Sequence, residues 1–298
     1  MAQDPRSSLS VPLTLIGVDA ALRAASNSDS CSTPKATLLE EEFSLSGSVA
    51  VVTGGQRGLG LEMAEALAEA GATVYCLDLP AEPDKSFGLT QEYVSKLGLP
   101  SGCLEYAAMD VTDQKGMWGI IEEIAEKEGR LDVCVVCAGL TNGDSCLEMS
   151  AEEFQKIMDV NVNGVFYTAQ AAARQMIKLG NSGSIILISS TAGRVAVKGK
   201  LAYSASKAAE IQMARSLACE LGPHRIRVNT LSPGYIRTAQ MAEFLDMNPE
   251  IEKEWSSQSL LGRIGRPHEL RGAIVWLASD ASSFCTGSDI AINGGHYA

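Results

Sequence analysis

The sequence lacks any apolar run that approaches the ~18 residues of a membrane-spanning helix. It also lacks a cluster of basic residues. Its 36 acidic residues outnumber its 24 basic ones and give a net charge of −12. Nucleic-acid phosphates and anionic membrane surfaces repel a chain of this charge. We therefore expect neither nucleic acid nor a membrane as a partner.

The eight cysteines lack the spacing of a metal site. Cys134 and Cys137 form one short pair, but it falls inside a predicted buried strand, where residues three apart point to opposite faces. No second pair and no nearby histidine completes a zinc site. We expect no metal, and reduced thiols in a cytoplasmic protein.

The first 42 residues lack aromatic side chains and show little hydrophobic periodicity. Their six acidic residues argue against a matrix-targeting helix, and their apolar stretches are too short for a secretory signal. We predict that residues 1–42 form a flexible extension. Residues 43–298 are predicted to form one domain, since neither a repeat nor a second boundary interrupts their pattern.

What the domain does contain is a regular alternation of apolar strands and helices. The predicted strands are 48–53, 73–77, 103–109, 131–137, 184–189, 226–231 and 289–293. The predicted helices are 61–70, 113–127, 151–179, 203–221 and 267–279. This alternation predicts an α/β fold, a Rossmann-like doubly wound parallel sheet with helices on both faces. Ligands of such sheets bind beyond the carboxyl ends of the strands.

A glycine loop follows the first strand, with the sequence Gly54-Gly55-Gln56-Arg57-Gly58-Leu59-Gly60. Glycines let the backbone approach a pyrophosphate, and the helix N-terminus after the loop favours negative charge. Asp78 ends the second strand, where an acid can accept hydrogen bonds from an adenosine ribose. The order of these elements predicts a dinucleotide site, and a tight structural turn is the alternative.

Tyr203 and Lys207 are four residues apart in a predicted helix, so their side chains leave the same face one turn apart. The ammonium favours the phenolate and lowers the pKa of the tyrosine from about 10. The pair therefore suits general acid/base chemistry on an alcohol or ketone. Ser190, after a predicted strand, can hydrogen-bond the same oxygen. This spacing also arises by chance, so other motifs have to support the interpretation.

These motifs together resemble the short-chain dehydrogenase/reductase family, over residues 43–293. The matching positions are Thr53-Gly54-x-x-x-Gly58-x-Gly60, Asp110, Asn161, Ser190, Tyr203-x-x-x-Lys207 and Pro233-Gly234. The resemblance implies an NAD(P)-dependent oxidoreductase that transfers hydride between nicotinamide and a secondary alcohol or ketone. The chain looks similar to fungal-type dehydrogenases of polyols and ketoses such as arabinitol, mannitol and sorbose.

The resemblance also implies roles for single residues. Tyr203 would be the acid/base, Ser190 would hold the substrate oxygen, and Lys207 would bind the nicotinamide ribose. Asn161 would anchor a proton-relay water. The residues implied to bind the cofactor are Gly54, Gln56, Arg57, Gly58, Leu59, Gly60, Asp78, Asp110, Val111, Ala138, Gly139, Tyr203, Lys207, Pro233, Gly234, Ile236 and Thr238.

Two of these residues have plain structural alternatives, and one position departs from the family. Asn161 alone is a polar residue that kinks its helix, and Asp110 alone is a cap for the helix after it. The family has Asn-Asn-Ala-Gly after the fourth strand, where this chain has Val136-Cys137-Ala138-Gly139. The missing Asn normally ties neighbouring strands together, so its loss predicts altered local geometry.

Asp78 and Arg57 favour different cofactors. The carboxylate accepts from a free ribose 2′-OH and repels a 2′-phosphate, whose added charge is about −1.5 to −2. Arg57 stands where NADP-binding members of the family hold that phosphate. The repulsion between a carboxylate and a facing phosphate should exceed the attraction from one exposed arginine. NAD is therefore favoured over NADP.

The substrate is not determined by these motifs, because fold and motifs give the reaction only. Residues 235–260 have the position of the family's substrate lid, with apolar residues expected to line a wall: Met241, Phe244, Leu245, Met247 and Trp255. The alternatives to a polyol or ketose enzyme are a biosynthetic ketoreductase, a cofactor-assisted cyclase or epimerase of a secondary metabolite, and a non-catalytic dinucleotide-binding scaffold. The resemblance also implies a homotetramer or homodimer.

Overall fold

The computed structural model describes residues 16–18, 37–141, 143 and 145–297. In this part of the chain one parallel sheet has the strand order β3-β2-β1-β4-β5-β6-β7. The strands are β1 Val49–Thr53, β2 Thr73–Asp78, β3 Cys103–Ala108, β4 Val133–Val136, β5 Gly183–Ile188, β6 Ile226–Pro233 and β7 Asp289–Ile292. The strand order reverses between β1 and β4, which confirms the predicted doubly wound fold.

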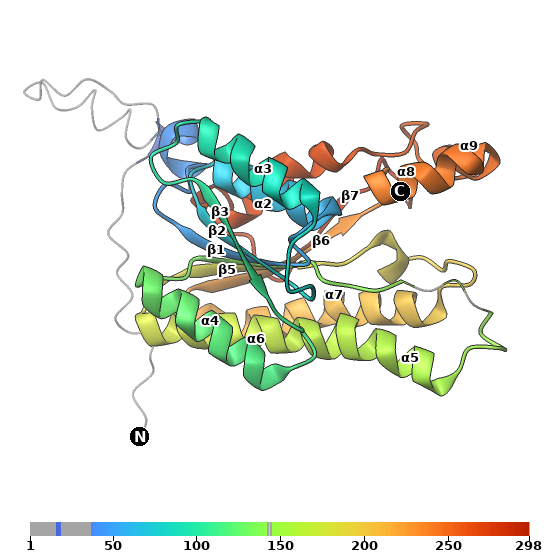
Figure 1. Ribbon diagram of the computed structural model, residues 1–298, viewed down its shortest axis with the longest axis horizontal. Coiled ribbons are helices and arrows are strands. Elements are labelled where there is room, and N and C mark those ends of the chain that lie inside the picture. Colours follow the sequence, from blue (N-terminus) through green and yellow to red (C-terminus); the bar gives the residue numbers. More distant parts are fainter. Residues whose placement is uncertain (1–15, 19–36, 142, 144, 298) are drawn as a thin grey trace, which may run out of the picture.

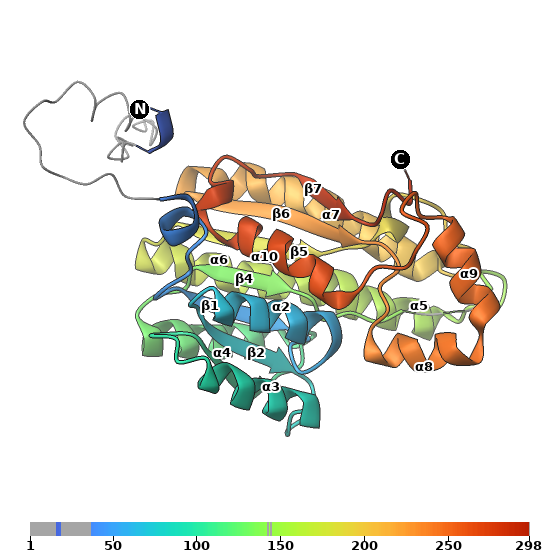
Figure 2. The same ribbon diagram turned by 90° about the horizontal axis from the view of Figure 1, so that it is seen from above.

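Helices cover both faces of the sheet (Figures 1 and 2). One face carries α4 Gln114–Glu128, α5 Ala151–Met158, α6 Val165–Leu179 and α7 Leu201–Leu221, and the other carries α2 Gly58–Glu69, α3 Lys85–Lys96 and α10 Arg271–Ala278. Successive strand residues point to opposite faces, so Val49 and Val51 join one core cluster while Ala50 and Val52 join the other. Burial on both faces explains why the strands read as continuous apolar runs.

The long helix predicted at 151–179 is broken, as the sequence predicts, at Asn161. A π-helix, η3 Asp159–Gly164, separates α5 from α6. A π-helical turn inserts an extra residue into the helix and is frequent at functional sites. Gly164 ends this turn, and a Cβ there would lie 2.8 Å from Val111 Cγ2. The missing side chain therefore lets the loop after β3 pack directly on the π-helix.

The sequence analysis missed three helices. The first is α3, which Asp84 caps by accepting the Ser86 amide at 2.8 Å. It buries only Phe87 and Val94, so its apolar periodicity is weak. The other two, α8 Ala239–Met247 and α9 Pro249–Ser257, lie within the predicted lid.

Residues 1–15 and 19–36 of the predicted extension lie outside the described residues. Its last five residues, Leu38–Glu42, form a short π-helix, η2, that contacts η7 Asp280–Ser282 of the domain. Among the described ranges, no helix combines the length and the apolar character needed to cross a membrane.

Candidate active site

A cleft of about 1200 Å³ lies beyond the carboxyl ends of β1, β2 and β4. This is the point where the strand order reverses and where sheets of this kind bind their ligands. The cleft is lined by most of the predicted cofactor residues, namely Gly54, Gln56, Arg57, Gly58, Leu59, Gly60, Asp78, Asp110, Val111, Ala138, Gly139 and Thr238. The fold thus gathers residues far apart in the sequence at one edge of the sheet.

The glycine loop is shaped by close backbone contacts. A Cβ on Gly60 would lie 2.1 Å from the carbonyl oxygen of Gly54, and a Cβ on Gly54 would lie 2.9 Å from the Ala138 amide nitrogen. Gly54 and Gly58 also have positive φ angles of +68° and +59°. These constraints bring the N-terminus of α2 to the cleft, where Gly58, Leu59 and Gly60 of its first turn form part of the lining. The loop therefore fits the pyrophosphate of a dinucleotide.

Asp78 is held in place by the backbone at the end of β2. Its Oδ2 accepts the Gln56 amide at 3.3 Å, and its Oδ1 accepts the Leu79 amide at 2.9 Å. Arg57, in contrast, is exposed at the rim of the cleft. The carboxylate thus has a fixed place beside the glycine loop.

The alternative interpretation of Asp110 as a helix cap is wrong. Asp113 caps α4, because its Oδ1 accepts the Gly116 amide at 3.0 Å. Asp110 instead accepts the Thr112 amide at 2.9 Å and the Thr112 hydroxyl at 2.8 Å. These bonds fix the loop after β3, where Asp110 lines the cleft.

Cys137 leaves the strand pairing around it intact. β1 and β4 stay paired up to Thr53 and Val136. The Thr53 hydroxyl accepts the amides of Cys137 at 3.2 Å and Ala138 at 3.3 Å, so it ties the two strand ends together. The altered geometry expected from the missing Asn is therefore not observed in the strand pairing.

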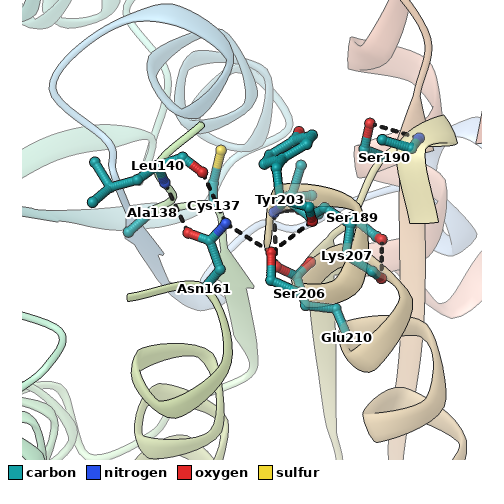
Figure 3. A network of polar contacts seen from close by, with 12 residues as sticks. Cys137, Ala138, Leu140, Asn161, Ser189, Ser190, Tyr203, Ser206, Lys207 and Glu210 are labelled. Carbon is teal, nitrogen blue, oxygen red and sulfur yellow. Dashed lines mark hydrogen bonds and ion pairs between the residues drawn. The ribbon is translucent and has the colours of Figure 1, made fainter. Parts of the chain in front are cut away.

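Asn161 joins the loop after β4 to α7 (Figure 3). Its Oδ1 accepts the Leu140 amide at 2.8 Å, and its Nδ2 donates to the Leu140 carbonyl at 2.9 Å and to the Ser206 hydroxyl at 3.0 Å. Ser206 in turn donates to the Tyr203 carbonyl at 2.7 Å. Both N–H donors of the buried side-chain amide are therefore used. A water next to Asn161 could only donate a hydrogen bond to one of its carbonyl oxygens.

The segment around Ser190 packs against the backbone of α7 through Ser189 and Gly193. Ser190 precedes the short helix η4 Thr191–Gly193, and its hydroxyl accepts the Ala192 amide at 3.2 Å. A Cβ on Gly193 would lie 2.8 Å from the Lys207 carbonyl group, and Ser189 donates its hydroxyl to that carbonyl oxygen at 2.8 Å. In the view of Figure 3, Tyr203 stands between Asn161 and Ser190.

Lys207 is buried and forms an ion pair with Glu210, a residue that the sequence analysis missed. Its Nζ donates to Glu210 Oε1 at 2.7 Å and to the Ile188 carbonyl at 2.8 Å, and it lies 5.7 Å from the centre of the Tyr203 ring. Burial raises the pKa of Glu210 to about 7, although the ammonium opposes this shift. Burial also disfavours the Lys207 ammonium, but the carboxylate and the phenol more than offset it, so the pKa of Lys207 is raised.

Gly139 connects this buried pair to the cleft. A Cβ at this position would lie 3.4 Å from Asn161 Oδ1 and 3.6 Å from Lys207 Nζ. Because Gly139 lines the cleft, the ammonium lies just behind its wall. The glycine therefore leaves room for a ligand to approach Lys207.

Five predicted cofactor residues are not in the cleft lining: Tyr203, Lys207, Pro233, Gly234 and Ile236. Pro233 ends β6, and the amide of Gly234 donates to the Ile292 carbonyl at 3.0 Å. A Cβ on Gly234 would lie 2.8 Å from Asn293 Cα, so this glycine allows β6 and β7 to approach closely. Ile236 lines a separate small pocket.

Comparison with known proteins agrees with this arrangement. The family model described as enoyl-(acyl carrier protein) reductase matches residues 54–297. Sorbose reductase of Candida albicans is 39% identical over 260 residues, which are 85% of this chain and 88% of the relative. The chain belongs to the short-chain dehydrogenase/reductase family. It is therefore an NAD(P)-dependent oxidoreductase of alcohols and ketones, as the motifs predict.

Solved members of the short-chain dehydrogenase/reductase family share the fold of most of this chain. A family member from Mycobacterium marinum has a TM-score of 0.79 and 39% identity, with 87% of this chain and 99% of that chain covered. A structure from Beutenbergia cavernae with bound NADP has a TM-score of 0.77 and 30% identity, with 86% and 98% covered. The predicted fold class is confirmed.

The lid of this short-chain dehydrogenase differs from the apolar wall that was expected. Leu245 is the fully buried residue of α8, while Met247 at the end of the same helix is 74% exposed. Trp255 stacks on Tyr235 with ring centres 4.3 Å apart. Thr238 and Gln240 are the lid residues that line the cleft, so this side of the lining is polar.

Proposed function

We propose that the protein transfers a hydride between nicotinamide and the secondary carbinol of a polyol or the carbonyl of the corresponding ketose. The observation that carries the proposal is the Tyr203–Lys207 pair behind the wall of the dinucleotide cleft. Gln240, a lid residue in the cleft lining that is not assigned to the cofactor, supports a hydroxylated substrate because its amide can hydrogen-bond a hydroxyl. Similar proteins include sorbose reductase of Candida albicans and the D-arabinitol 2-dehydrogenase of Candida tropicalis, 34% identical over 85% of this chain and 94% of the relative.

In the proposed reaction the dinucleotide supplies the hydride acceptor or donor. The Tyr203 phenol exchanges a proton with the substrate oxygen, which the Ser190 hydroxyl also hydrogen-bonds. The Lys207 ammonium stabilises the phenolate, because an opposite charge nearby favours the ionised phenol. Asn161 ties the loop after β4 to α7, the helix that carries Tyr203 and Lys207.

We propose NAD as the preferred cofactor. Asp78 is fixed beside the glycine loop by two amides, where its charge repels a ribose 2′-phosphate. Arg57 is exposed, and a solvent-screened charge offsets this repulsion only in part. NADP is the competing cofactor, because structures of family members from Beutenbergia cavernae and Agrobacterium tumefaciens contain bound NADP.

The test is the absorbance of reduced nicotinamide during reactions with a panel of polyols, ketoses and simple secondary alcohols. Each substrate is run with NAD and with NADP, for the wild type and for Tyr203→Phe. We expect turnover of a polyol with NAD, and a fall of about 10²–10⁴-fold in the variant because it loses general acid/base catalysis. Full activity of folded Tyr203→Phe contradicts the proposal.

A biosynthetic ketoreductase is the second candidate. A short-chain dehydrogenase/reductase of Aspergillus versicolor is 37% identical, and the 3-oxoacyl-[acyl-carrier-protein] reductase of Thermotoga maritima is 38% identical. Turnover of β-ketoacyl thioesters but of no sugar favours this candidate. Turnover without a net change in absorbance indicates a cyclase or epimerase, and a cellular role that survives Tyr203→Phe indicates a scaffold.

We also propose a homotetramer or homodimer in the cytoplasm. The seven cysteines in the described ranges are free thiols, which suits a reducing compartment. Phe284, on the loop before β7, is fully exposed in the single chain. A large apolar side chain on the surface suggests a contact with a second subunit. Light scattering of the purified protein tests the assembly, and a monomer at micromolar concentration contradicts it.

A further inference from the structure

The turn that carries Ser190 lies in the connection between β5 and α7, and its start is anchored to both β6 and α7. The Ser189 amide donates to the Leu231 carbonyl of β6 at 2.9 Å. The Ser189 hydroxyl donates to the Lys207 carbonyl of α7 at 2.8 Å (Figure 3). These two bonds hold the backbone immediately before Ser190.

The hydroxyl of Ser190 takes its direction from its own turn. It accepts the Ala192 amide at 3.2 Å, and the Ser190 carbonyl accepts the Gly193 amide at 3.0 Å. A hydroxyl that accepts a hydrogen bond keeps its own hydrogen as a donor, so Ser190 can offer this hydrogen to a substrate oxygen. The direction in which the hydrogen points therefore depends on where the whole turn lies.

Arg194 directly follows this turn and connects it to β7. Its amide donates to the Thr191 carbonyl at 2.9 Å, so its backbone continues the turn. Its Nε forms an ion pair with Asp289 Oδ2, and its guanidinium lies over the Tyr297 ring, 5.7 Å from the ring centre. A guanidinium at this distance from a ring face is attracted to it. Residues of β7 and of the C-terminal segment thus hold the far end of the turn.

Asp289 is a well-fixed anchor for the arginine. Its side chain is 1% exposed, and its Oδ1 accepts the hydroxyls of Thr230 and Ser232 on β6, both at 2.6 Å. β6 also pairs with β5, the strand that leads into Ser190. Removing the charged partner of a buried carboxylate leaves an uncompensated charge, so Asp289 favours the arrangement in which Arg194 reaches it.

We propose that Arg194 is a positioning residue that holds the turn of Ser190 against β7 through Asp289, and so sets the direction in which the Ser190 hydroxyl meets the substrate oxygen. The inference rests on the proposed dehydrogenase function for its consequence in turnover. Its structural content, a turn held by an ion pair to β7, requires no substrate.

The proposal predicts that Arg194 affects turnover through Ser190. Arg194→Met keeps a long side chain but removes the charge, so the turn loses its bond to β7. We expect kcat to fall about tenfold, because a small displacement of a group that contacts the reacting atoms is costly. The Kd of the dinucleotide should not change, since the glycine loop lies in another part of the site. In a protein that already carries Ser190→Ala, the same substitution should change kcat less than about twofold.

The experiment is a double-mutant cycle of kcat over wild type, Arg194→Met, Ser190→Ala and the combined variant. Hydrogen exchange of the Ala192 amide is measured in wild type and Arg194→Met. The exchange should be faster in the variant, because the turn opens more often once its far end is released. Arg194→Lys keeps a positive charge near Asp289 and should recover part of the lost turnover.

Arg227→Met is the matched control for a loss of stability alone. Arg227 lies at the opposite end of β6 and donates to the carbonyls of Leu277 at 2.9 Å and Ser279 at 3.1 Å. Its replacement should lower the free energy of unfolding, because it leaves buried polar groups without partners. It should change neither kcat nor the exchange of the Ala192 amide.

An equal fall of kcat with and without Ser190→Ala overturns the proposal, and so does an unchanged exchange of the Ala192 amide in folded Arg194→Met. If Arg194→Met does not fold, the variant that combines it with Asp289→Asn removes both charges and is judged by the same criteria. A wild type that turns over no alcohol or ketone overturns the proposed function alone. The exchange of the Ala192 amide, which needs no substrate, then decides the role of Arg194.

Discussion

The two halves of the cleft are built on different physical principles. The dinucleotide half, at the ends of β1 and β2, is shaped by backbone atoms that approach each other because side chains are missing at Gly54 and Gly60. The catalytic half, at the end of β5, is shaped by buried charges on α7, Lys207 and Glu210. The first half should respond to added atoms, and the second to a change of charge.

The largest effect should come from adding one methyl group to the dinucleotide half. In Gly60→Ala the new Cβ would lie 2.1 Å from a backbone oxygen, which cannot move without opening the loop. We expect more than about 3 kcal/mol of lost stability, or complete loss of dinucleotide binding. Thermal unfolding and the fluorescence of bound reduced dinucleotide measure these two outcomes.

Gly139→Ala is the matched control for this prediction. Its Cβ would have ordinary contacts of 3.4 Å and 3.6 Å, so the protein should fold normally. The methyl group would stand at the cleft wall in front of Lys207, so dinucleotide binding should weaken while stability stays within about 0.5 kcal/mol of the wild type. Equal stability of Gly60→Ala and Gly139→Ala would contradict the steric account of the glycine loop.

The same contrast explains what the sequence reveals. The glycine loop, its flanking strands and the Tyr203–Lys207 spacing are local patterns, so they predict the fold and most of the cleft. Glu210 is found only when the buried face of α7 is known, because its partner contacts depend on how the helix packs on β5. An acid one turn from Lys207 and next to the buried Ile211 was the available signal.

The lid shows a second reason for failure. Its apolar residues were expected to face the cleft, but Phe244 and Trp255 pack on each other, and Trp255 also stacks on Tyr235. Sequence patterns indicate that a side chain is apolar and do not indicate which of two surfaces it covers. The departure at Cys137 was overestimated for a related reason, because the Thr53 hydroxyl that ties the strand ends belongs to a distant segment.

The next largest effect should come from the charged half, as a dependence of stability on pH. Burial raises the pKa of Glu210 from 4.5 in its ordinary state to about 7 in the folded protein. The folded state therefore favours the protonated acid, so this contribution to stability is fully present below about pH 4.5 and is lost as pH rises through about 7. It should amount to at most about 3 kcal/mol.

Denaturant unfolding of wild type and Glu210→Gln from pH 4 to pH 8 measures this contribution as a difference between the two proteins. The wild type should lose stability relative to the variant as pH rises, and the difference should level off above pH about 7. Glu269 is the control with the opposite sign, because its hydrogen bond from Arg263 lowers its pKa to about 2. Its contribution to stability is lost as pH falls below about 4.5. Glu269→Gln should therefore leave the pH dependence of the unfolding free energy above that pH unchanged.

The smallest effect should come from Asp78, the carboxylate that is held beside the glycine loop. Asp78→Ser removes the repulsion of a 2′-phosphate, and we expect the ratio of NADP to NAD affinity to rise about tenfold, or about 1.4 kcal/mol. Arg57→Ala should move the same ratio the other way, because the exposed guanidinium attracts that phosphate. Competition binding of the two reduced dinucleotides at low and high salt separates the two residues. The exposed arginine should lose its effect in high salt, while the fixed carboxylate keeps most of its own. If the ratio does not respond to Asp78→Ser, the carboxylate does not set cofactor choice, and the account of Asp78 as the residue that excludes a 2′-phosphate is wrong.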